Sequence, residues 1–305
     1  PLYGVWAPAY DLAFTQHVAN ENVQCIYWHT AAGGLSELVK PLIDYYCDHM
    51  EIHRENARKL YGCKGIMIST YTSPENFIIA PNVNIIIHFL GCAGWVARHF
   101  YDYYLYTKDE KTFNNKILPF MIETAEFYED FHYVDKDGKL VLYPACSPEN
   151  SPSDYRHIRT NFPMPTTKNP TVEIAILKDL LIRLLDISKS RPELSGKAKK
   201  WQGMLDIIPD YRINEDGAIA EWMDENVHDE YLHRHISHIY PFFPGDEVER
   251  LRPDLKPYFK KAIELRDIRY FAGWSQPHLS AIYARLNDAK TALDEFNKTI
   301  KNKVK

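Results

Sequence analysis

The sequence predicts an all-α fold built as a toroid of helical hairpins, and three observations support this prediction. Apolar residues recur at spacings of three and four over most of the 305 residues, whereas strand-like alternation is almost absent. Short turns and long irregular stretches alternate between the helical segments, as in stacked hairpins. No Gly/Ser-rich linker divides the chain, so we interpret residues 1–305 as a single domain.

The clearest hairpin lies in the first half of the chain. Residues 82–107 and residues 110–132 each carry an apolar stripe with helical spacing, which gives each predicted helix one buried face. Asp109, two residues after Thr107, is a suitable N-cap for the second helix. The short turn between the two segments predicts antiparallel helices that lie side by side.

The other helices follow from the same reasoning. Asn169 followed by Pro170 is a cap with proline in the first helical position, so a helix is expected over residues 171–189. Further helices are predicted at residues 34–62, 193–206, 254–268, 274–286 and 288–302. Long irregular stretches occupy residues 63–80, 139–169 and 207–230. Because long loops between hairpins gather at one end of a toroid, we expect the functional site at that end.

Composition narrows the classes of function. The formal net charge is −5 and the pI is about 6.2, which provides no basic field for a nucleic-acid partner. No apolar run approaches the roughly 20 residues that a membrane-spanning helix needs. We therefore expect neither a nucleic-acid partner nor a membrane span, and the oligomeric state stays open.

The five cysteines are an odd number, and none lies in a CxxC pair or beside histidine at metal-ligand spacing. We interpret them as buried thiols rather than as a disulfide framework. The chain begins at Pro1 rather than at Met, which suggests a trimmed product or a domain fragment. The residues themselves leave the cellular location unknown.

The loop YPACSPENSPSDY, residues 143–155, contains the leading catalytic candidate, Glu149. The prolines of this loop restrict its backbone. A carboxyl group held between Pro144 and Pro148 would be partly desolvated, which suits a general acid. The alternative is an ordinary loop or helix-capping glutamate.

Two asparagines stand close together near the N-terminus, in HVANENVQCIYWH. Asn20 and Asn22 are two residues apart, and in an extended loop such side chains project to the same side. Both amides would then face one ligand. Alternatively, either asparagine caps the segment that follows.

Two later segments carry further candidates. HRHISHIYPFFPG, residues 233–245, groups Arg234 and His235 with aromatic residues, and these side chains suit hydrogen bonds to hydroxyl groups or to a carboxylate. No acidic residue completes the histidine pattern, so no metal site is expected. In AGWSQPHLSAIYARLNDAKTA, residues 272–292, Trp274 opens a predicted helix, and Asp288 is at least a natural N-cap for the next one.

Taken together, these segments resemble glycoside hydrolase family 95, whose members include α-L-fucosidases with an (α/α)6 barrel. NENVQCIYW and AGWVARHFYDYYLYTKD resemble two family blocks, and SPEN, RHISHIYPFFPG and GWS followed by ARLND resemble three more in the same order. The resemblance runs from about Leu2 to Ala292. It implies an (α/α)6 toroid that lacks the family's flanking β-domains and whose first helices are missing before Pro1.

The resemblance also implies an inverting glycosidase that needs no cofactor. Glu149 would protonate the glycosidic oxygen, while Asn20 and Asn22 would hold the attacking water and Asp288 would polarise these amides. We therefore expect the Glu149 carboxyl group roughly 6 to 10 Å from the two amides. We expect Asp288 within hydrogen-bond reach of one amide, which is about 2.6 to 3.2 Å.

Substrate-binding residues follow from the same resemblance. Arg234 and His235 would bind sugar hydroxyls, Trp95 would pack against the sugar ring, and Trp274 belongs to the same predicted site. The segment GIMISTYTSPENF, residues 65–77, departs from the family because the usual histidines are missing and a second SPEN supplies Glu75. Glu75 is therefore either a recognition residue with altered specificity or a simple turn residue.

These implications lead to one main hypothesis and two alternatives. The main hypothesis is an exo-acting hydrolase that removes a terminal α-L-fucose, or the related α-L-galactose, from an oligosaccharide or polysaccharide. A non-catalytic carbohydrate-binding relative of the same fold is the first alternative, and a helical scaffold protein without a sugar ligand is the second. A periplasmic or secreted location would fit the family.

Overall fold

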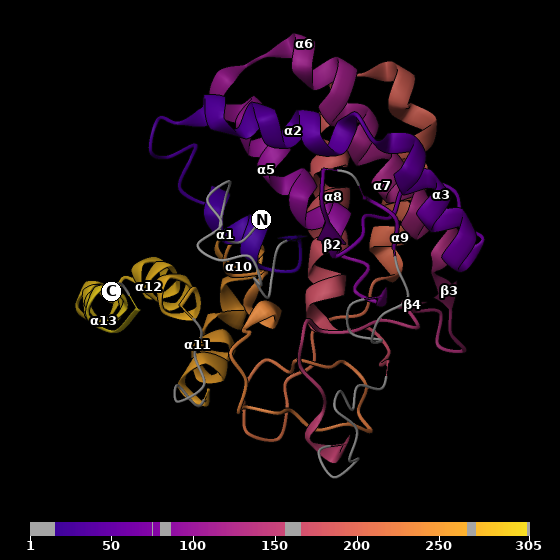
Figure 1. Cartoon of the computed structure of the whole chain (residues 1–305). Coiled ribbons are helices and arrows are strands. Elements are labelled where there is room, and N and C mark those ends of the chain that lie inside the picture. The colour runs from indigo at the N-terminus through magenta and orange to yellow at the C-terminus, as the bar shows by residue number, and fades with distance from the viewer. Residues whose placement is uncertain (1–15, 75, 80–86, 156–165, 267–272, 304–305) are drawn as a thin grey trace.

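The computed structural model describes residues 16–74, 76–79, 87–155, 166–266 and 273–303 (Figure 1). Helices dominate this part of the chain, and the strands in it are two residues long. β1 (His17–Val18) pairs antiparallel with β2 (Tyr71–Thr72), and β3 (Tyr133–Val134) pairs antiparallel with β4 (Leu140–Val141). The predicted all-α class is confirmed.

The helix expected over residues 34–62 is wrong as one element. A short helix, α1 (Asn22–Tyr27), precedes this range. Within the range the structure has a 3-10 turn η1 (Ser36–Val39), followed by α2 (Lys40–Cys47) and α3 (Met50–Tyr61). His49 breaks the helix between α2 and α3, with φ −116° and ψ 23°. Its ring stacks on Phe77 with 3.9 Å between the centroids, and its Nδ1 bonds the Tyr45 carbonyl at 2.9 Å. Tertiary packing therefore overrides the local helical pattern here.

The predicted central hairpin is present, but its first arm begins at Cys92 rather than at residue 82, because the described residues 88–91 are not helical. It consists of α5 (Cys92–Thr107), the short α6 (Glu110–Thr112), a π-helical segment η2 (Phe113–Ile117) and α7 (Leu118–Phe131). Asp109 caps the second arm, because its Oδ1 accepts a hydrogen bond from the Thr112 backbone N–H at 3.0 Å. Residues 82–86 of the predicted first arm lie outside the described residues.

The next hairpin pairs α8 (Thr171–Ser188) with α9 (Ser195–Ile207) through the turn η4 (Pro192–Leu194). The predicted start of α8 is right, but the predicted cap is wrong. The Asn169 side chain turns back instead, accepting from the Leu142 N–H at 2.6 Å and donating to the Leu140 carbonyl at 2.9 Å. Asn169 thereby ties the β3–β4 hairpin to the start of α8.

The C-terminal part completes the helical architecture. It contains η5 (Ser237–Ile239), α10 (Glu247–Arg250), η6 (Pro253–Leu255), α11 (Lys256–Glu264), α12 (Ser275–Arg285) and α13 (Ala289–Lys303). α12 and α13 pack together as a hairpin beside α11 (Figure 1). A 3-10 turn, η3 (Ser153–Tyr155), lies in the loop region before α8.

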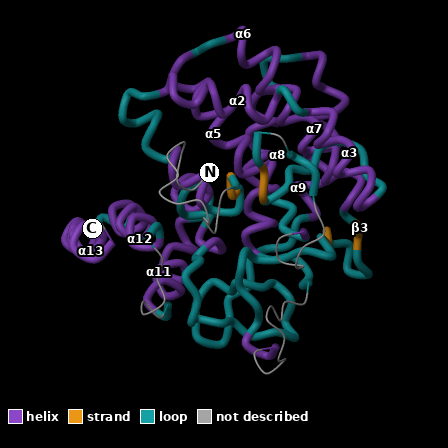
Figure 2. The backbone as a smooth tube through the Cα atoms, viewed as in Figure 1, coloured by secondary structure: helices purple, strands orange, loops and turns teal. Residues whose placement is uncertain are grey.

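α5 and α8 form the centre of the core. α5 is buried along most of its length, and Gly94 allows α8 to approach closely, because a Cβ there would lie 2.4 Å from Cγ2 of Ile176. The long loops that follow β4 and α9 gather at one end of these helices (Figure 2). Among the described residues, no helix is long and apolar enough to cross a bilayer.

Candidate active site

Glu149 lies in a tight turn among the gathered loops. The Asn150 N–H donates to the Ser147 carbonyl at 3.1 Å, so residues 147–150 form a β-turn with Pro148 second and Glu149 third. Proline at the second position presets the backbone angle that such a turn needs. The Glu149 side chain is 21% exposed, so it is sheltered and still reachable from solvent.

Three side chains from distant parts of the sequence meet the Glu149 carboxylate. The Nδ2 of Asn20 donates to Oε1 at 3.2 Å, and the guanidinium of Arg234 donates to Oε2. The Nε2 of His235 lies 3.8 Å from Oε2. The structure thus brings together four of the residues that the sequence predicted for one site.

Asn20 is held rigidly where the strand pair meets α1. The Ala19 N–H donates to the Thr70 carbonyl at 2.8 Å, and the Gln24 amide donates to the Ala19 carbonyl at 2.7 Å. Asn20 itself is fully buried, and its Oδ1 has no hydrogen-bond partner among the described residues. The predicted separation from Glu149 is wrong for Asn20, because the two side chains are in direct contact.

Asn22 is the first residue of α1 and is partly exposed. The residue between the two asparagines, Glu21, is fully buried and lies 3.0 Å from Nδ1 of His278. Asn20 and Glu21 are thus both buried, whereas Asn22 is partly exposed. Sequence inspection did not single out Glu21.

Asp288 does not make the contact that was expected of it. Its Oδ1 accepts from the Thr291 N–H at 3.0 Å and its Oδ2 accepts from the Thr291 hydroxyl at 2.8 Å. These bonds cap α13 and lower the pKa of the Asp288 carboxyl group. The predicted hydrogen bond to Asn20 or Asn22 is therefore wrong. Both carboxylate oxygens of Asp288 are instead used to cap the start of α13.

Trp95 is also placed differently from the prediction. It lies on α5 with no exposed surface, and its ring packs edge-on against Tyr240 with 5.5 Å between the centroids. A ring that is enclosed by protein cannot stack on a sugar, so Trp95 is a core residue. Trp274, at the start of α12, is partly exposed and packs edge-on against His235 with 4.6 Å between the centroids. Trp274 therefore borders the Glu149 cluster.

His235 is a buried, uncharged imidazole in this site. Burial lowers its pKa well below the usual range, and the neighbouring His233 and Arg234 lower it further. The ring of His233 stacks on His235, and burial lowers the pKa of His233 to about 3. Arg234 is thus the positive charge next to Glu149.

The segment that departs from the family pattern contributes a residue that sequence reasoning missed. Tyr71, in β2, has its pKa raised to about 12, mainly by burial and then by the charge of Glu149. The charge of the candidate acid therefore acts on the Tyr71 phenol. Glu75, the residue predicted in this segment, lies outside the described residues. A tyrosine in a short strand has no sequence signal that separates it from core tyrosines.

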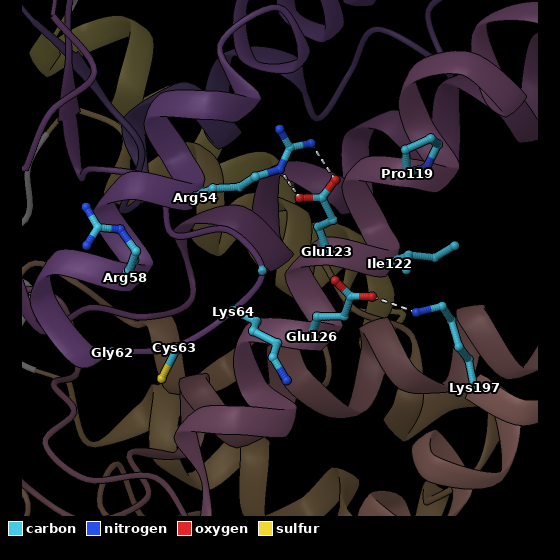
Figure 3. Close-up of a pocket in the computed structure, with 11 residues that line it drawn as sticks. Arg54, Arg58, Gly62, Cys63, Lys64, Pro119, Ile122, Glu123, Glu126 and Lys197 are labelled. Atoms are coloured by element: carbon cyan, nitrogen blue, oxygen red, sulfur yellow. Dashed lines mark hydrogen bonds and ion pairs between the residues drawn. The ribbon is translucent and has the colours of Figure 1, made fainter.

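A large pocket elsewhere contains none of the predicted residues. It has a volume of about 740 Å³ and lies between α3, α7 and the start of α9 (Figure 3). Its charges are largely paired: Arg54 binds Glu123 at 2.6 Å and Lys197 binds Glu126 at 2.6 Å. We therefore assign the site by its chemistry rather than by its volume.

A toroid of helical hairpins that holds a carboxyl group among amide, guanidinium and imidazole groups is compatible with the catalytic domain of a glycoside hydrolase. The model of the glycosyl hydrolase family 95 catalytic domain matches residues 1–305, and the chain belongs to this family.

Several known proteins are similar to this chain. Alpha-L-fucosidase 2 of Arabidopsis thaliana is 29% identical over 305 residues, which cover 95% of this chain and 34% of that protein. Probable alpha-fucosidase A of Aspergillus niger is 24% identical over 320 residues, which cover 99% of this chain and 39% of that protein. The chain thus spans little more than a third of these relatives.

A solved structure supports the fold. The protein titled "Putative kojibiose phosphorylase from human microbiome" superimposes with a TM-score of 0.61 at 14% identity, covering 93% of this chain and 48% of that chain. At this identity the likeness concerns the fold alone. It agrees with the (α/α)6 toroid that was expected from the sequence.

Proposed function

We propose that this chain carries the active site of an exo-acting glycoside hydrolase that releases terminal α-L-fucose, or the related α-L-galactose, with inversion at the anomeric carbon. The convergence of Asn20, Arg234 and His235 on the Glu149 carboxylate carries this proposal. The names of the relatives support fucose as the sugar. L-Galactose has one additional hydroxyl group, and a small change in the pocket decides whether it is accepted.

In the proposed reaction, Glu149 gives its proton to the glycosidic oxygen as the bond between that oxygen and the anomeric carbon breaks. A water molecule forms the new bond from the opposite face and releases a proton to bulk solvent, from which Glu149 regains its proton before the next turnover. The buried Oδ1 of Asn20 is an unused acceptor among the described residues and would orient that water. Because the transition state resembles an oxocarbenium ion, orientation of the water contributes to the rate even though an amide is a weak base.

Sugar entry must rearrange the contacts of Glu149. An inverting enzyme keeps roughly 6 to 10 Å between its acid and the group that holds the water, whereas Asn20 lies 3.2 Å from Glu149 here. Arg234 is 39% exposed in its side chain, so it can leave the carboxylate for a sugar hydroxyl. Catalytic hydrogen bonds commonly reach their final geometry only in the substrate complex.

The test measures turnover and stereochemistry. Purified protein is incubated with aryl α-L-fucoside, aryl α-L-galactoside and fucosylated oligosaccharides, and proton NMR identifies the first anomer released. We expect release of the β-anomer. Glu149→Gln should lower kcat by a factor on the order of 100 to 10,000. Glu126→Gln, which changes a carboxylate in the separate pocket, is the matched control and should retain activity.

A non-catalytic sugar-binding protein would give a different result. It would bind the oligosaccharide, as shown by calorimetry, without releasing any sugar, and Glu149→Gln would change only the affinity. First release of the α-anomer would contradict inversion while leaving hydrolysis intact.

A further inference from the structure

The turn that carries Glu149 is hydrogen-bonded to one buried carboxylate, that of Glu221. The Ser147 hydroxyl donates to Oε1 of Glu221 at 2.6 Å, and the Asn150 amide donates to Oε2 at 2.9 Å. Ser147 and Asn150 are the first and last residues of the β-turn. A single side chain therefore fixes both ends of the turn whose third residue is Glu149.

Glu221 is itself firmly placed. Its side chain has no exposed surface, and it forms an ion pair with Arg266, which is also almost fully buried. The backbone N–H of Glu221 donates to Asp229 at 2.9 Å, and its carbonyl accepts from Thr171 at the start of α8 at 3.0 Å. The position of the Glu221 carboxylate is thus fixed by contacts that extend into the helical core.

Arg266 connects this ion pair to the next loop. Its second nitrogen donates to the Glu230 carbonyl at 2.8 Å, and the Asn150 amide donates to the same carbonyl at 3.0 Å. Glu230 lies four residues before Arg234, which contacts Glu149 directly. The network therefore joins the loop of the candidate acid to the loop of its arginine partner.

We propose that Glu221 is a positioning residue, which sets the place of the Glu149 carboxyl group and its distance from the Arg234 loop. The inference rests on the proposed function, since it assumes that Glu149 is the general acid. A buried ion pair alone is weak evidence for a stabilising role, because apolar residues often replace such a pair without loss of stability. The distinctive feature is that the remaining hydrogen bonds of Glu221 go to both ends of the catalytic turn.

Two substrates with different leaving groups distinguish a positioning role of Glu221 from a role in the stability of the fold. A dinitrophenolate leaves without being protonated, whereas the alcohol of an oligosaccharide leaves only with help from the acid. A displaced Glu149 therefore slows cleavage of the oligosaccharide and spares the dinitrophenyl glycoside. A misplacement of about 1 Å can lower such a rate by a factor on the order of 100. Loss of folded protein would instead lower both rates by the same factor.

Two variants of the network are compared with wild type on both substrates. Glu221→Gln keeps the shape of the side chain but removes its charge. Ser147→Ala removes one hydrogen bond and keeps the Glu221–Arg266 ion pair, so it covers the case in which Glu221→Gln fails to fold. We expect kcat on the oligosaccharide to fall at least about 10-fold more than kcat on the dinitrophenyl glycoside. Thr124→Ala removes a buried hydroxyl that bonds the Phe120 carbonyl within α7, and it serves as the control.

Equal losses on the two substrates in the network variants, or no loss in either, would overturn the positioning role. Absence of turnover by wild type on every substrate would instead contradict the proposed function itself. Thermal melting of each variant shows how much folded protein is present, so the rates are compared at equal folded concentration.

Discussion

The guanidinium of Arg234 donates a hydrogen bond to Oε2 of Glu149, although 85 residues separate the two in the sequence. A second arginine–glutamate pair, Arg54 with Glu123, joins α3 to α7 at 2.6 and 2.8 Å. The two pairs are chemically alike, but the second is at the large pocket and away from the candidate acid. They therefore provide a matched comparison of a site pair with a surface pair.

Arg234→Lys should lower kcat/KM by a factor of about 10 or more, because lysine cannot reproduce the planar fork that meets a carboxylate or two hydroxyls. Arg54→Lys should leave kcat/KM unchanged and should change stability by no more than about 1 kcal/mol, as exposed pairs do. Steady-state kinetics and urea unfolding of both variants test this. Equal kinetic losses in the two would mean that the Arg234 pair has no special place in turnover.

Two buried asparagines make a second matched pair. The amide of Asn20 contacts Glu149, whereas that of Asn56 bonds the Met67 and Phe77 carbonyls at 3.2 and 2.9 Å. Asn20→Ala should lower kcat by a factor on the order of 100, comparable to the loss of a positioned catalytic group. Asn56→Ala should cost about 1 to 3 kcal/mol of stability, because buried backbone groups lose their partner, and should leave kcat unchanged. An active Asn20→Ala enzyme would exclude a role for this amide in holding water.

The helices with strong apolar periodicity could be predicted from sequence, and those with tertiary breaks could not. α8 lies within one residue of its predicted bounds because its apolar spacing is regular. The break at His49 depends on Phe77, which is 28 residues away and has no local signal. Pattern reasoning identifies helices, whereas contacts between distant segments decide where some of them are interrupted.

The candidate site was predictable where short sequence segments resemble those of the family. Glu149, Asn20, Arg234 and His235 were named from their segments and do meet. The sugar-packing role that the resemblance implied for Trp95 does not agree with the structure, because the ring has no exposed surface and packs against Tyr240 in the core. Glu221 was missed because it is one glutamate within the irregular stretch 207–230, and the partners of its side-chain hydrogen bonds lie more than 40 residues away in the sequence.

A buried carboxyl group at the start of α8 leads to the last prediction, which concerns pH. Glu173 has no exposed surface, and its Oε1 accepts from the Leu90 N–H at 2.7 Å. Burial raises the pKa of Glu173 to about 8, although the Leu90 and Gly91 N–H groups act in the opposite direction. The corresponding value in the unfolded chain is 4.5. Between these two values the folded protein binds more protons than the unfolded chain, so stability must fall as the pH rises through this window.

The pH window and the variant make this prediction testable. A rise from 4.5 to about 8 corresponds to a loss on the order of 3 to 5 kcal/mol from this residue, at 1.36 kcal/mol for each pKa unit. Glu173→Gln is neutral at every pH and keeps an acceptor for Leu90, so its free energy of unfolding should fall less between pH 5 and pH 8.5 than that of wild type. Urea unfolding at these two pH values measures the difference. Glu51→Gln changes a glutamate whose side chain is 96% exposed, and it should retain the wild-type dependence on pH. If Glu173→Gln retains that dependence as well, Glu173 is ionised in the folded protein and its burial does not govern the pH response.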